Sequence, residues 1–455
     1  MTLKKTALFL FGIFTGIVIQ AQEKKAFSLK AAQDFGVENS FQVKNAKTDV
    51  EIARKKIMET ASYGAPQINA EGNFQNFINI PTQVIPAKAF NPMADPSVLS
   101  PVRFGTNYNS SASIVASQMI FYGQYIVGVQ ATKAYAALSR QNLIKTESEI
   151  RSAVAQSYFT VLMAEENKEV LKKTLENSEK IWKETQQLYK NGLVEESSVD
   201  QLELLVSNLK NGKSKIEKQI ELAYMLLKFQ MGMNIDDSIE LTENLNGILS
   251  QIQAENMVNN EFKPQSHIDF QLIESQKRLM TLNLRKERFS YMPRIATFLS
   301  HSKNAFRNDM SFGPGTPWYP ATIWGVKVSL PIFDGGGQIA RTKIAKLELE
   351  KTLNNQNMLE QSLKLQVQSA KSGLSNAIEV LKTEKQNLAL AEKIQDKTFK
   401  KYKEGISSSF ELNQIQNQYL STQSNYINAL FELLNANQKL EKALGINESK
   451  FEFLK

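Results

Sequence analysis

The chain contains two similar stretches that lie 213 residues apart, Tyr189-Lys190-Asn191-Gly192-Leu193 and Tyr402-Lys403-Glu404-Gly405-Ile406. On both sides of each stretch, apolar residues recur at steps of three, four and seven, which is the spacing of a coiled-coil seam. Glycine readily adopts the backbone conformation that ends a helix. Each stretch is therefore predicted to be the turn of a helical hairpin. The seam residues are Leu171, Leu175, Trp182, Leu202, Leu209 and Ile216 in the first hairpin, and Leu374, Ile378, Leu381, Leu388, Ile415 and Tyr419 in the second.

The prolines limit where long helices can run. None of the twelve lies in residues 122–263 or 332–455, and a proline inside a helix costs about 3 kcal/mol or more. A continuous helix from about Gln124 to Tyr189 would be on the order of 100 Å long at ~1.5 Å per residue. That length exceeds a globular domain, so ordinary core packing alone does not explain these seams.

The segments that contain proline show the other period. From Ile68 to Ile80 and from Ile323 to Ile332, one alternate set of positions is mainly apolar and the other mainly polar. This alternation predicts strands with one apolar face. Residues 108–121 and 293–302 are weaker strand candidates, and residues 81–103 and 308–320 are predicted to be the loops that join each pair of strands.

The two halves of the chain match in register. Ile120-Phe121-Tyr122-Gly123 corresponds to Ile332-Phe333-Asp334-Gly335 at an offset of 212, and Met231-Gly232-Met233-Asn234 corresponds to Leu444-Gly445-Ile446-Asn447 at 213. Chance matches do not keep an offset over so long a distance, so the chain is predicted to be an internal duplication. Each copy is predicted to contain a helix, a β-hairpin and a long helical hairpin.

The predicted organisation is as follows. The first repeat covers residues 22–235, with a β-hairpin at 65–122 and a helical hairpin at 124–232. An irregular linker of the kind called equatorial covers 236–262. The second repeat covers 263–446, with a β-hairpin at 293–333 and a helical hairpin at 338–445, and a tail covers 447–455.

The start of the chain is typical of a secretory signal peptide. Lys4 and Lys5 precede an apolar stretch at 7–19, and Ala21 precedes a charged run. This pattern predicts export, with cleavage after Ala21. No later apolar run reaches eighteen residues, which argues against a transmembrane helix. The absence of cysteine excludes disulfides and thiolate sites.

Four strands per chain cannot close a membrane β-barrel. An open sheet edge in lipid leaves backbone groups unsatisfied at a cost of several kcal/mol each, roughly. Strands from several copies must then join, and three copies would give twelve strands. The predicted fold class is thus mixed α and β, with membrane β-barrel strands continued by a long coiled-coil α-helical barrel.

Residues for catalysis or cofactor binding are not evident. The two histidines, His267 and His301, lie in different contexts, and the Gly335-Gly336-Gly337 run lacks the lysine of a phosphate-binding loop. Methionines Met225, Met231 and Met233 are typical of core packing near a helix end. The positive charge is diffuse, so nucleic acid is not expected as a partner. We therefore predict no enzyme, no cofactor and no metal site.

The Leu330-Pro331-Ile332-Phe333-Asp334-Gly335-Gly336 run, the two tyrosine–glycine turns and the Leu-Gly end of the last helix resemble the TolC-type outer-membrane efflux proteins. The resemblance covers roughly Phe27 to Ile446. It implies a homotrimer in the outer membrane of a Gram-negative bacterium, in contact with its lipid and with a helical extension through the periplasm. It also implies docking onto a periplasmic adaptor protein and an inner-membrane transporter, in drug efflux, metal efflux or protein secretion.

The resemblance also implies roles for particular residues. The adaptor contacts of the family map onto the two turns, at Asn191, Gly192, Leu193, Glu404, Gly405 and Ile406, although both glycines are equally explained as turn residues. The aspartates of a closed entrance map onto Glu411 and Gln414. The tyrosine of a closed-state lock maps onto Tyr402, while its aspartate and arginine partners map onto Ser198 and Ser407. Glu411 could supply one cation-favouring ring, or it could be an ordinary solvated helix residue.

A protein of a different class would share some of these features. A periplasmic coiled-coil adaptor or a structural envelope protein would also have a signal peptide and coiled-coil seams. It would not need four alternating strands flanked by aromatic residues, which are typical of a membrane interface. Those aromatic residues are Tyr63, Tyr108, Tyr291, Trp318 and Tyr319.

Overall fold

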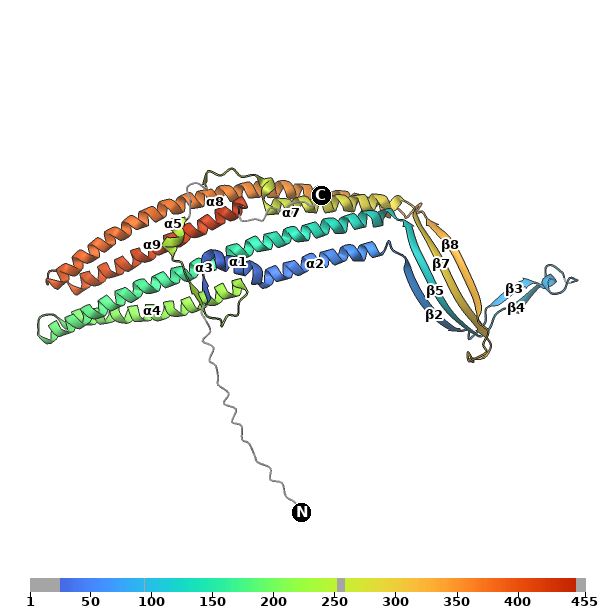
Figure 1. Cartoon of the computed structure of the whole chain (residues 1–455), viewed down its shortest axis with the longest axis horizontal. Coiled ribbons are helices and arrows are strands. Elements are labelled where there is room, and N and C mark those ends of the chain that lie inside the picture. The colour runs from blue at the N-terminus through green and yellow to red at the C-terminus, as the bar shows by residue number, and fades with distance from the viewer. Residues whose placement is uncertain (1–24, 94, 252–257, 447–455) are drawn as a thin grey trace, which may run out of the picture. The chain divides into compact units, whose positions relative to one another are not determined.

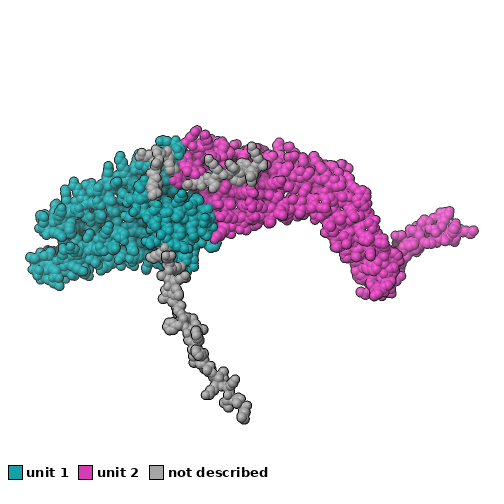
Figure 2. Space-filling model, viewed as in Figure 1, with its two compact units in different colours: residues 1–41, 149–260, 370–440 teal, residues 42–148, 261–369, 441–455 magenta. Residues whose placement is uncertain are grey.

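The structure is a computed structural model that describes residues 25–93, 95–251 and 258–446. The predicted signal peptide and C-terminal tail lie outside the described residues. The described chain is mostly helical with a smaller β portion (Figure 1). It divides into two compact units: unit 1 contains residues 1–41, 149–260 and 370–440, and unit 2 contains residues 42–148, 261–369 and 441–455 (Figure 2).

Four long helices dominate the chain. Two are very long, α3 (Gly123–Lys190, 68 residues) and α8 (Gly337–Lys403, 67 residues), and each contributes to both units. The other two, α4 (Glu196–Met231) and α9 (Ser409–Leu444), have 36 residues each. No helix in the described ranges is both long and apolar enough to span a membrane.

A four-stranded antiparallel sheet lies in unit 2. Its order is β2-β5-β7-β8, and its strands are β2 (Gln67–Asn76), β5 (Tyr108–Phe121), β7 (Arg294–Arg307) and β8 (Tyr319–Ser329). The central pair β5–β7 joins the hairpin of the first half to that of the second, from Tyr108 opposite Arg307 to Phe121 opposite Ile295. Strands β2 and β8 are the edges of this sheet.

The segment 81–103, expected to be a simple loop, contains a further hairpin. Strands β3 (Thr82–Pro86) and β4 (Leu99–Arg103) pair with each other as a separate two-stranded sheet, with the short 3₁₀ helix η1 (Ala87–Ala89) after β3. Its valine and isoleucine, Val84 and Ile85, give strand propensity that the prolines at 86 and 101 had obscured. Proline is tolerated here because both strands are edges.

The shorter elements begin each half of the chain. Helices α1 (Leu29–Asn39) and α2 (Phe41–Ser62) precede β2, and α7 (Ile268–Arg288) precedes β7, with the 3₁₀ helices η2 (Pro264–Ser266) and η3 (Phe289–Tyr291) at its ends. The segment expected to be an irregular linker contains β6 (Ile239–Leu241), which pairs in parallel with β1 (Lys25–Phe27), and α5 (Leu245–Gln251).

The core of unit 1 is formed where α1 packs on α3 and α4. Tyr158 and Phe159 of α3 and Leu227 and Met231 of α4 are fully buried. The Tyr158 hydroxyl donates a hydrogen bond of 3.0 Å to the carbonyl of Phe27, which satisfies the one polar atom of that side chain, as a buried phenol requires. Burial raises the pKa of Tyr158 well above its usual value, so the hydroxyl stays a donor.

Candidate functional site at the hairpin tips

The two helical hairpins turn in the same way. At the first tip, the Leu193 amide donates to the Leu188 carbonyl (2.9 Å) and the Gly192 amide to the Tyr189 carbonyl (2.8 Å). At the second tip, Ile406 and Gly405 donate to Lys401 and Tyr402 at 2.9 and 3.0 Å. This pair of bonds is the Schellman motif, which needs a left-handed residue at the glycine position. Both glycines have that conformation, with φ of 72° and 73°.

The surface of both tips is open. Asn191, Gly192, Glu404 and Gly405 are exposed, and a Cβ placed on either glycine would meet nothing within 4 Å. The residues after the glycines are apolar and exposed, Leu193 at 69% and Ile406 at 70%. A Schellman turn often buries that residue against the last helical turn, whereas both of these aliphatic side chains stay exposed.

Glu411 lies in the first turn of α9, where it has a clear structural role. Its carboxylate accepts a hydrogen bond from the Ser407 hydroxyl (2.8 Å), and its amide donates to the Ser408 hydroxyl (3.1 Å). An acidic residue here also interacts favourably with the positive end of the helix dipole. Two of the sequence-predicted gate residues, Ser407 and Glu411, are thus brought together by a helix cap. Gln414 lies exposed one turn further along α9.

Tyr402 bridges the two hairpins. Its hydroxyl is 2.7 Å from the Thr185 hydroxyl of α3, and either group can donate. The sequence comparison had assigned the partner position to Ser198, which is half-buried near the start of α4 and donates its amide to the Glu195 carbonyl. The Tyr402 contact is therefore a bond between two neutral hydroxyl groups.

A second hydrogen bond also joins the hairpins. The Ser409 hydroxyl donates to the Gln201 side-chain oxygen of α4 at 3.0 Å, and both groups lie close to the tips. Thr185, Gln201 and Ser409 were not among the site residues predicted from the sequence. Thr185 follows the seam residue Trp182 by three residues, so helical spacing places it on the packed face. A polar residue on this otherwise apolar face was the feature of the sequence that could have indicated a hydrogen bond between the hairpins.

Apolar packing surrounds these bonds. Leu412 of α9 is buried among residues of the first hairpin, and Tyr402 and Phe399 of α8 pack against the same cluster. Two hydroxyl groups bonded inside an apolar cluster are partly shielded from competing water, which makes their hydrogen bond stronger than it would be in solvent. The other buried members are Leu175, Ile181, Leu202, Leu205, Val206 and Leu209.

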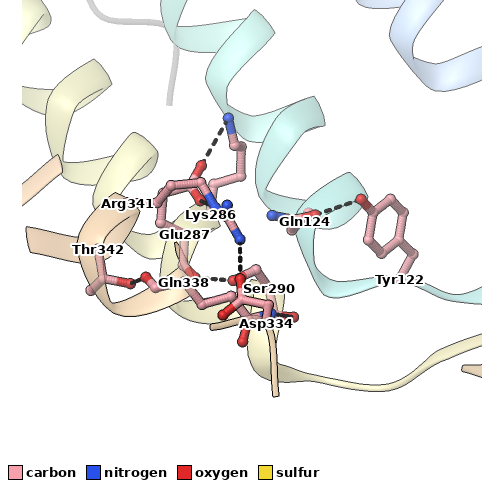
Figure 3. Close-up of polar contacts among 9 residues, drawn as sticks. All are labelled: Tyr122, Gln124, Lys286, Glu287, Ser290, Asp334, Gln338, Arg341 and Thr342. Carbon is pink, nitrogen blue, oxygen red and sulfur yellow. Dashed lines mark hydrogen bonds and ion pairs between the residues drawn. The ribbon is translucent and has the colours of Figure 1, made fainter. Parts of the chain in front are cut away.

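Polar contacts also organise the junction between β8 and α8 in unit 2 (Figure 3). Asp334 pairs with Arg341 at 2.8 Å, and Arg341 lies 3.9 Å from Glu287 at the end of α7. The Gln338 side chain donates to the Ser290 carbonyl at 3.2 Å. Hydrogen bonding from the Gln338 backbone amide, and then Arg341, holds the pKa of Asp334 below its usual value. The aspartate is therefore charged when it caps α8.

Among the residues that the structure describes, no ion pair is found at the corresponding junction between β5 and α3. Tyr122 occupies the place of Asp334, and its hydroxyl donates to the Gln124 side chain at 2.5 Å (Figure 3). The guanidinium of Arg294 lies over the Tyr122 ring, 4.6 Å from its centroid. This arrangement is a cation–π contact.

Metal ligation is not supported by the described ranges. In residues 25–93, 95–251 and 258–446, no three acidic or histidine side chains converge on a common point. His267 is buried at the start of α7, where its Nδ1 accepts the Asp269 amide at 3.2 Å and its Nε2 lies 3.3 Å from the Lys442 carbonyl. These contacts make it a helix cap.

Solved structures with the same fold are outer-membrane channels. The Campylobacter jejuni channel CmeC matches with a TM-score of 0.72 at 16% identity, covering 93% of this chain and 87% of that chain. The open state of the Neisseria gonorrhoeae channel MtrE matches at 0.71 and 17%, covering 92% and 88%. The Vibrio cholerae protein VceC matches at 0.69 and 14%, covering 92% and 96%. Comparison with curated protein sequences gives no significant match.

Comparison of the sequence with family models gives a match that covers most of the chain. The model described as outer membrane efflux protein matches residues 36–232 and 269–446. These two ranges contain both helical hairpins, all four strands of the sheet and both junctions. The chain therefore belongs to the outer membrane efflux protein family.

Proposed function

We propose that the chain forms the outer-membrane exit duct of a tripartite efflux or type I secretion system. One observation carries the proposal: the four-stranded sheet has an exposed apolar face. The strand register places on that face seven large apolar side chains, each about half exposed or more, namely Ile68, Phe74, Ile114, Leu299, Trp324, Val326 and Val328. A sheet in water would cover such a face, whereas a sheet in lipid exposes it.

The opposite face of the same sheet is mostly polar. Along β2 it carries Gln67, Asn69, Glu71, Asn73 and Gln75. The register aligns these mainly with serine and asparagine residues of β5 and β7, together with Val115, Phe298 and Phe306. An apolar outer face and a polar inner face are what a water-filled barrel in a membrane requires. The polar face then lines the path of the substrate.

Closure of the barrel requires further copies of the chain. The edges β2 and β8 have unpaired backbone groups on one side, and leaving them in lipid costs several kcal/mol per group, roughly. Three copies, with β8 of one beside β2 of the next, give twelve strands. Helices α3 and α8 have 68 and 67 residues, and α4 and α9 have 36 each, which is consistent with an internal duplication. Each repeat would then contribute one β-hairpin to the barrel.

The hairpin tips are the proposed docking site for a periplasmic adaptor. Leu193 and Ile406 supply one exposed aliphatic side chain per tip, and the polar groups of Asn191 and Glu404 flank them. A small apolar centre with a polar rim is typical of a protein interface. Cross-linking from either position to the adaptor, and through it to an inner-membrane transporter, tests this assignment.

The entrance at the tips is proposed to be held by neutral contacts. Tyr402 with Thr185 and Ser409 with Gln201 connect neighbouring hairpins, while Glu411 serves the cap of α9. If Glu411 also lines the pore, Glu411→Gln lowers cation preference in bilayer conductance. An unchanged reversal potential would leave Glu411 with its capping role alone.

Fractionation of cells that express the full chain tests the proposal as a whole. The duct requires recovery from outer membranes only with detergent, as a trimer, and ion conductance after reconstitution in a planar bilayer. Recovery as a soluble periplasmic protein would overturn the duct and favour the coiled-coil adaptor or structural protein. Deletion of the chain from a host that depends on it should also raise its sensitivity to exported toxic compounds.

A further inference from the structure

We propose that the polar face of the sheet carries an anion-binding site at its helix-proximal end, formed by Arg294 and Lys327, for a small amphipathic anion. The proposal rests on the proposed duct, in which this face lines the lumen. It adds a class of ligand, an aromatic or aliphatic body with a carboxylate or sulfonate group.

The strand register brings the two cations together. Arg294 of β7 is opposite Ser329 of β8, and Lys327 of β8 is opposite Ala296 of β7. The two cations are therefore diagonal neighbours on one face, roughly 7–8 Å apart at Cα, which is within reach of long side chains. A guanidinium and an ammonium at this spacing can both contact one anionic group.

Neither charge is neutralised by the rest of the described chain. Arg307 pairs with Asp309 and Arg341 with Asp334, but in the part of the chain that the structure describes Arg294 and Lys327 make no ion pair. Two uncompensated positive charges close together raise the local concentration of anions. They also attract any anionic group that enters the lumen.

The surroundings add apolar contacts. A cavity of about 450 Å³ lies beside the two cations, and its lining includes the apolar and aromatic side chains of Tyr63, Met119, Phe121 and Tyr122. That volume is within the range of sites for drug-sized ligands. Arg294 is held over the Tyr122 ring at 4.6 Å, which reduces the freedom of its guanidinium.

Three copies would place three such sites around the lumen, with two positive charges in each. These charges are formed by residues other than Glu411 of the tips. The anion site would then slow and select anionic substrates at the base of the barrel. A lipid headgroup carries the same anionic chemistry, and a lipid source is an outcome of the test below.

Direct binding tests the site independently of conductance. The detergent-solubilised full-length protein is titrated calorimetrically with naphthalene-2-sulfonate, and with naphthyl-trimethylammonium as the cationic control. The double variant Arg294→Gln/Lys327→Gln should weaken sulfonate binding about tenfold or more, the scale of losing charge-assisted hydrogen bonds. Lys303→Gln removes a charge from the opposite face of β7 and should change binding less than about twofold.

A variant that exchanges the two cations and keeps both charges controls for a loss of folding in the glutamine variant. Arg294→Lys/Lys327→Arg should keep sulfonate binding near that of the unmodified protein. Equal binding of the sulfonate and the ammonium probe, or equal binding by the double glutamine variant, overturns the proposal. Loss of phosphatidylglycerol binding in the double glutamine variant with sulfonate binding intact also overturns it, because the anion would then be a lipid.

Bilayer conductance separates this proposal from the duct itself. In phosphatidylcholine bilayers, the sulfonate should block current through the unmodified protein more strongly than through the double glutamine variant. A protein that binds the sulfonate through Arg294 and Lys327 but conducts no ions supports the site and contradicts the duct. A protein that conducts ions with equal block in both forms supports the duct and overturns the site.

Discussion

The segment from α2 to α4 and the segment from α7 to α9 share the order helix, two paired strands, long helix and helix, although only the first also contains the β3–β4 hairpin. They differ at the residues where the helices begin. The first strand-to-helix junction uses Tyr122 and the second uses Asp334. The first tip leads into α4, whose N-cap Glu195 makes no side-chain cap bond, and the second leads into α9 through the Ser408 cap. The helical frame is common to both, and its boundary residues distinguish one copy from the other.

The largest expected loss of stability is at Gly232. This glycine has a positive φ like the two tip glycines, but other atoms pack closely around it. Gly232 ends α4 with a φ of 73°, and a Cβ there would lie 2.4 Å from the Asn39 carbonyl oxygen. We expect Gly232→Ala to lower the free energy of unfolding by about 2–5 kcal/mol, because left-handed strain and overpacking add. Thermal unfolding in detergent measures this, and a loss no greater than that of Gly192→Ala would contradict it.

The two tip glycines should respond alike. Each has open space around it and a positive φ, so Gly192→Ala and Gly405→Ala should each cost about 1–2 kcal/mol from left-handed strain alone. Local opening at the tips is best measured by amide hydrogen exchange. A difference between the tips larger than about 0.5 kcal/mol would exceed additive error and show that the two turns are not equivalent.

The helix caps should respond differently. Ser408→Ala removes a side-chain cap of α9, and we expect a loss of about 1 kcal/mol. Ser197→Ala is the same substitution near the start of α4, two residues after the N-cap Glu195, whose exposed carboxylate the Ser197 hydroxyl contacts. That variant should change stability by less than about 0.5 kcal/mol. Equal effects in chemical unfolding would mean that the caps do not distinguish the hairpins.

The tip tyrosines provide a functional comparison. Tyr402→Phe removes the bond to Thr185. If that bond holds the proposed gate closed, its loss should destabilise the closed state by about 0.5–1.5 kcal/mol. Tyr189→Phe is the control, since among the described residues its hydroxyl has no hydrogen-bond partner. Single-channel recording should show a larger open fraction for the first variant only. If the pore stays closed in both variants, Tyr402 is not part of the gate.

The smallest expected effect is a pH dependence of stability that comes from the buried His267 at the start of α7. Burial lowers the pKa of His267 below its usual 6.5, and Lys145 and Lys442 act in the same direction, whereas Asp269 and the hydrogen bond to the Lys442 carbonyl oppose it. The folded state thus prefers the neutral ring. The contribution of this neutral ring to the free energy of unfolding is fully present above pH 6.5 and is lost as the pH falls below that value.

A non-titrating cap tests this sign. His267→Asn keeps an acceptor for the Asp269 amide, so its melting temperature should fall less between pH 7.5 and pH 5.5, values chosen on either side of the usual histidine range. A drop equal to that of the unmodified protein would assign the pH dependence to other groups. The corresponding position in the first half has no histidine, so the effect belongs to the second half.

Sequence alone predicted the mixed α and β fold class and the family, because helix, strand and turn are local decisions. Alternating residues from Ile68 and around Trp324 indicated the strands, and Gly192 and Gly405 marked the turns, since few other residues adopt a positive φ. The resemblance that these motifs suggested is confirmed by the family match. The roles of Glu411, Gln414 and Ser198 at a gate stay predictions.

Tertiary structure decided which distant residues meet. The bonds from Tyr402 to Thr185 and from Ser409 to Gln201 span more than two hundred residues, and no local pattern fixes the rotation of one hairpin against another. The pairing of β7 with β8 likewise brought Arg294 beside Lys327. Register and helix packing depend on the summed burial of many side chains. The sequence by itself therefore determined the elements of this protein, and the tertiary structure decided its contacts.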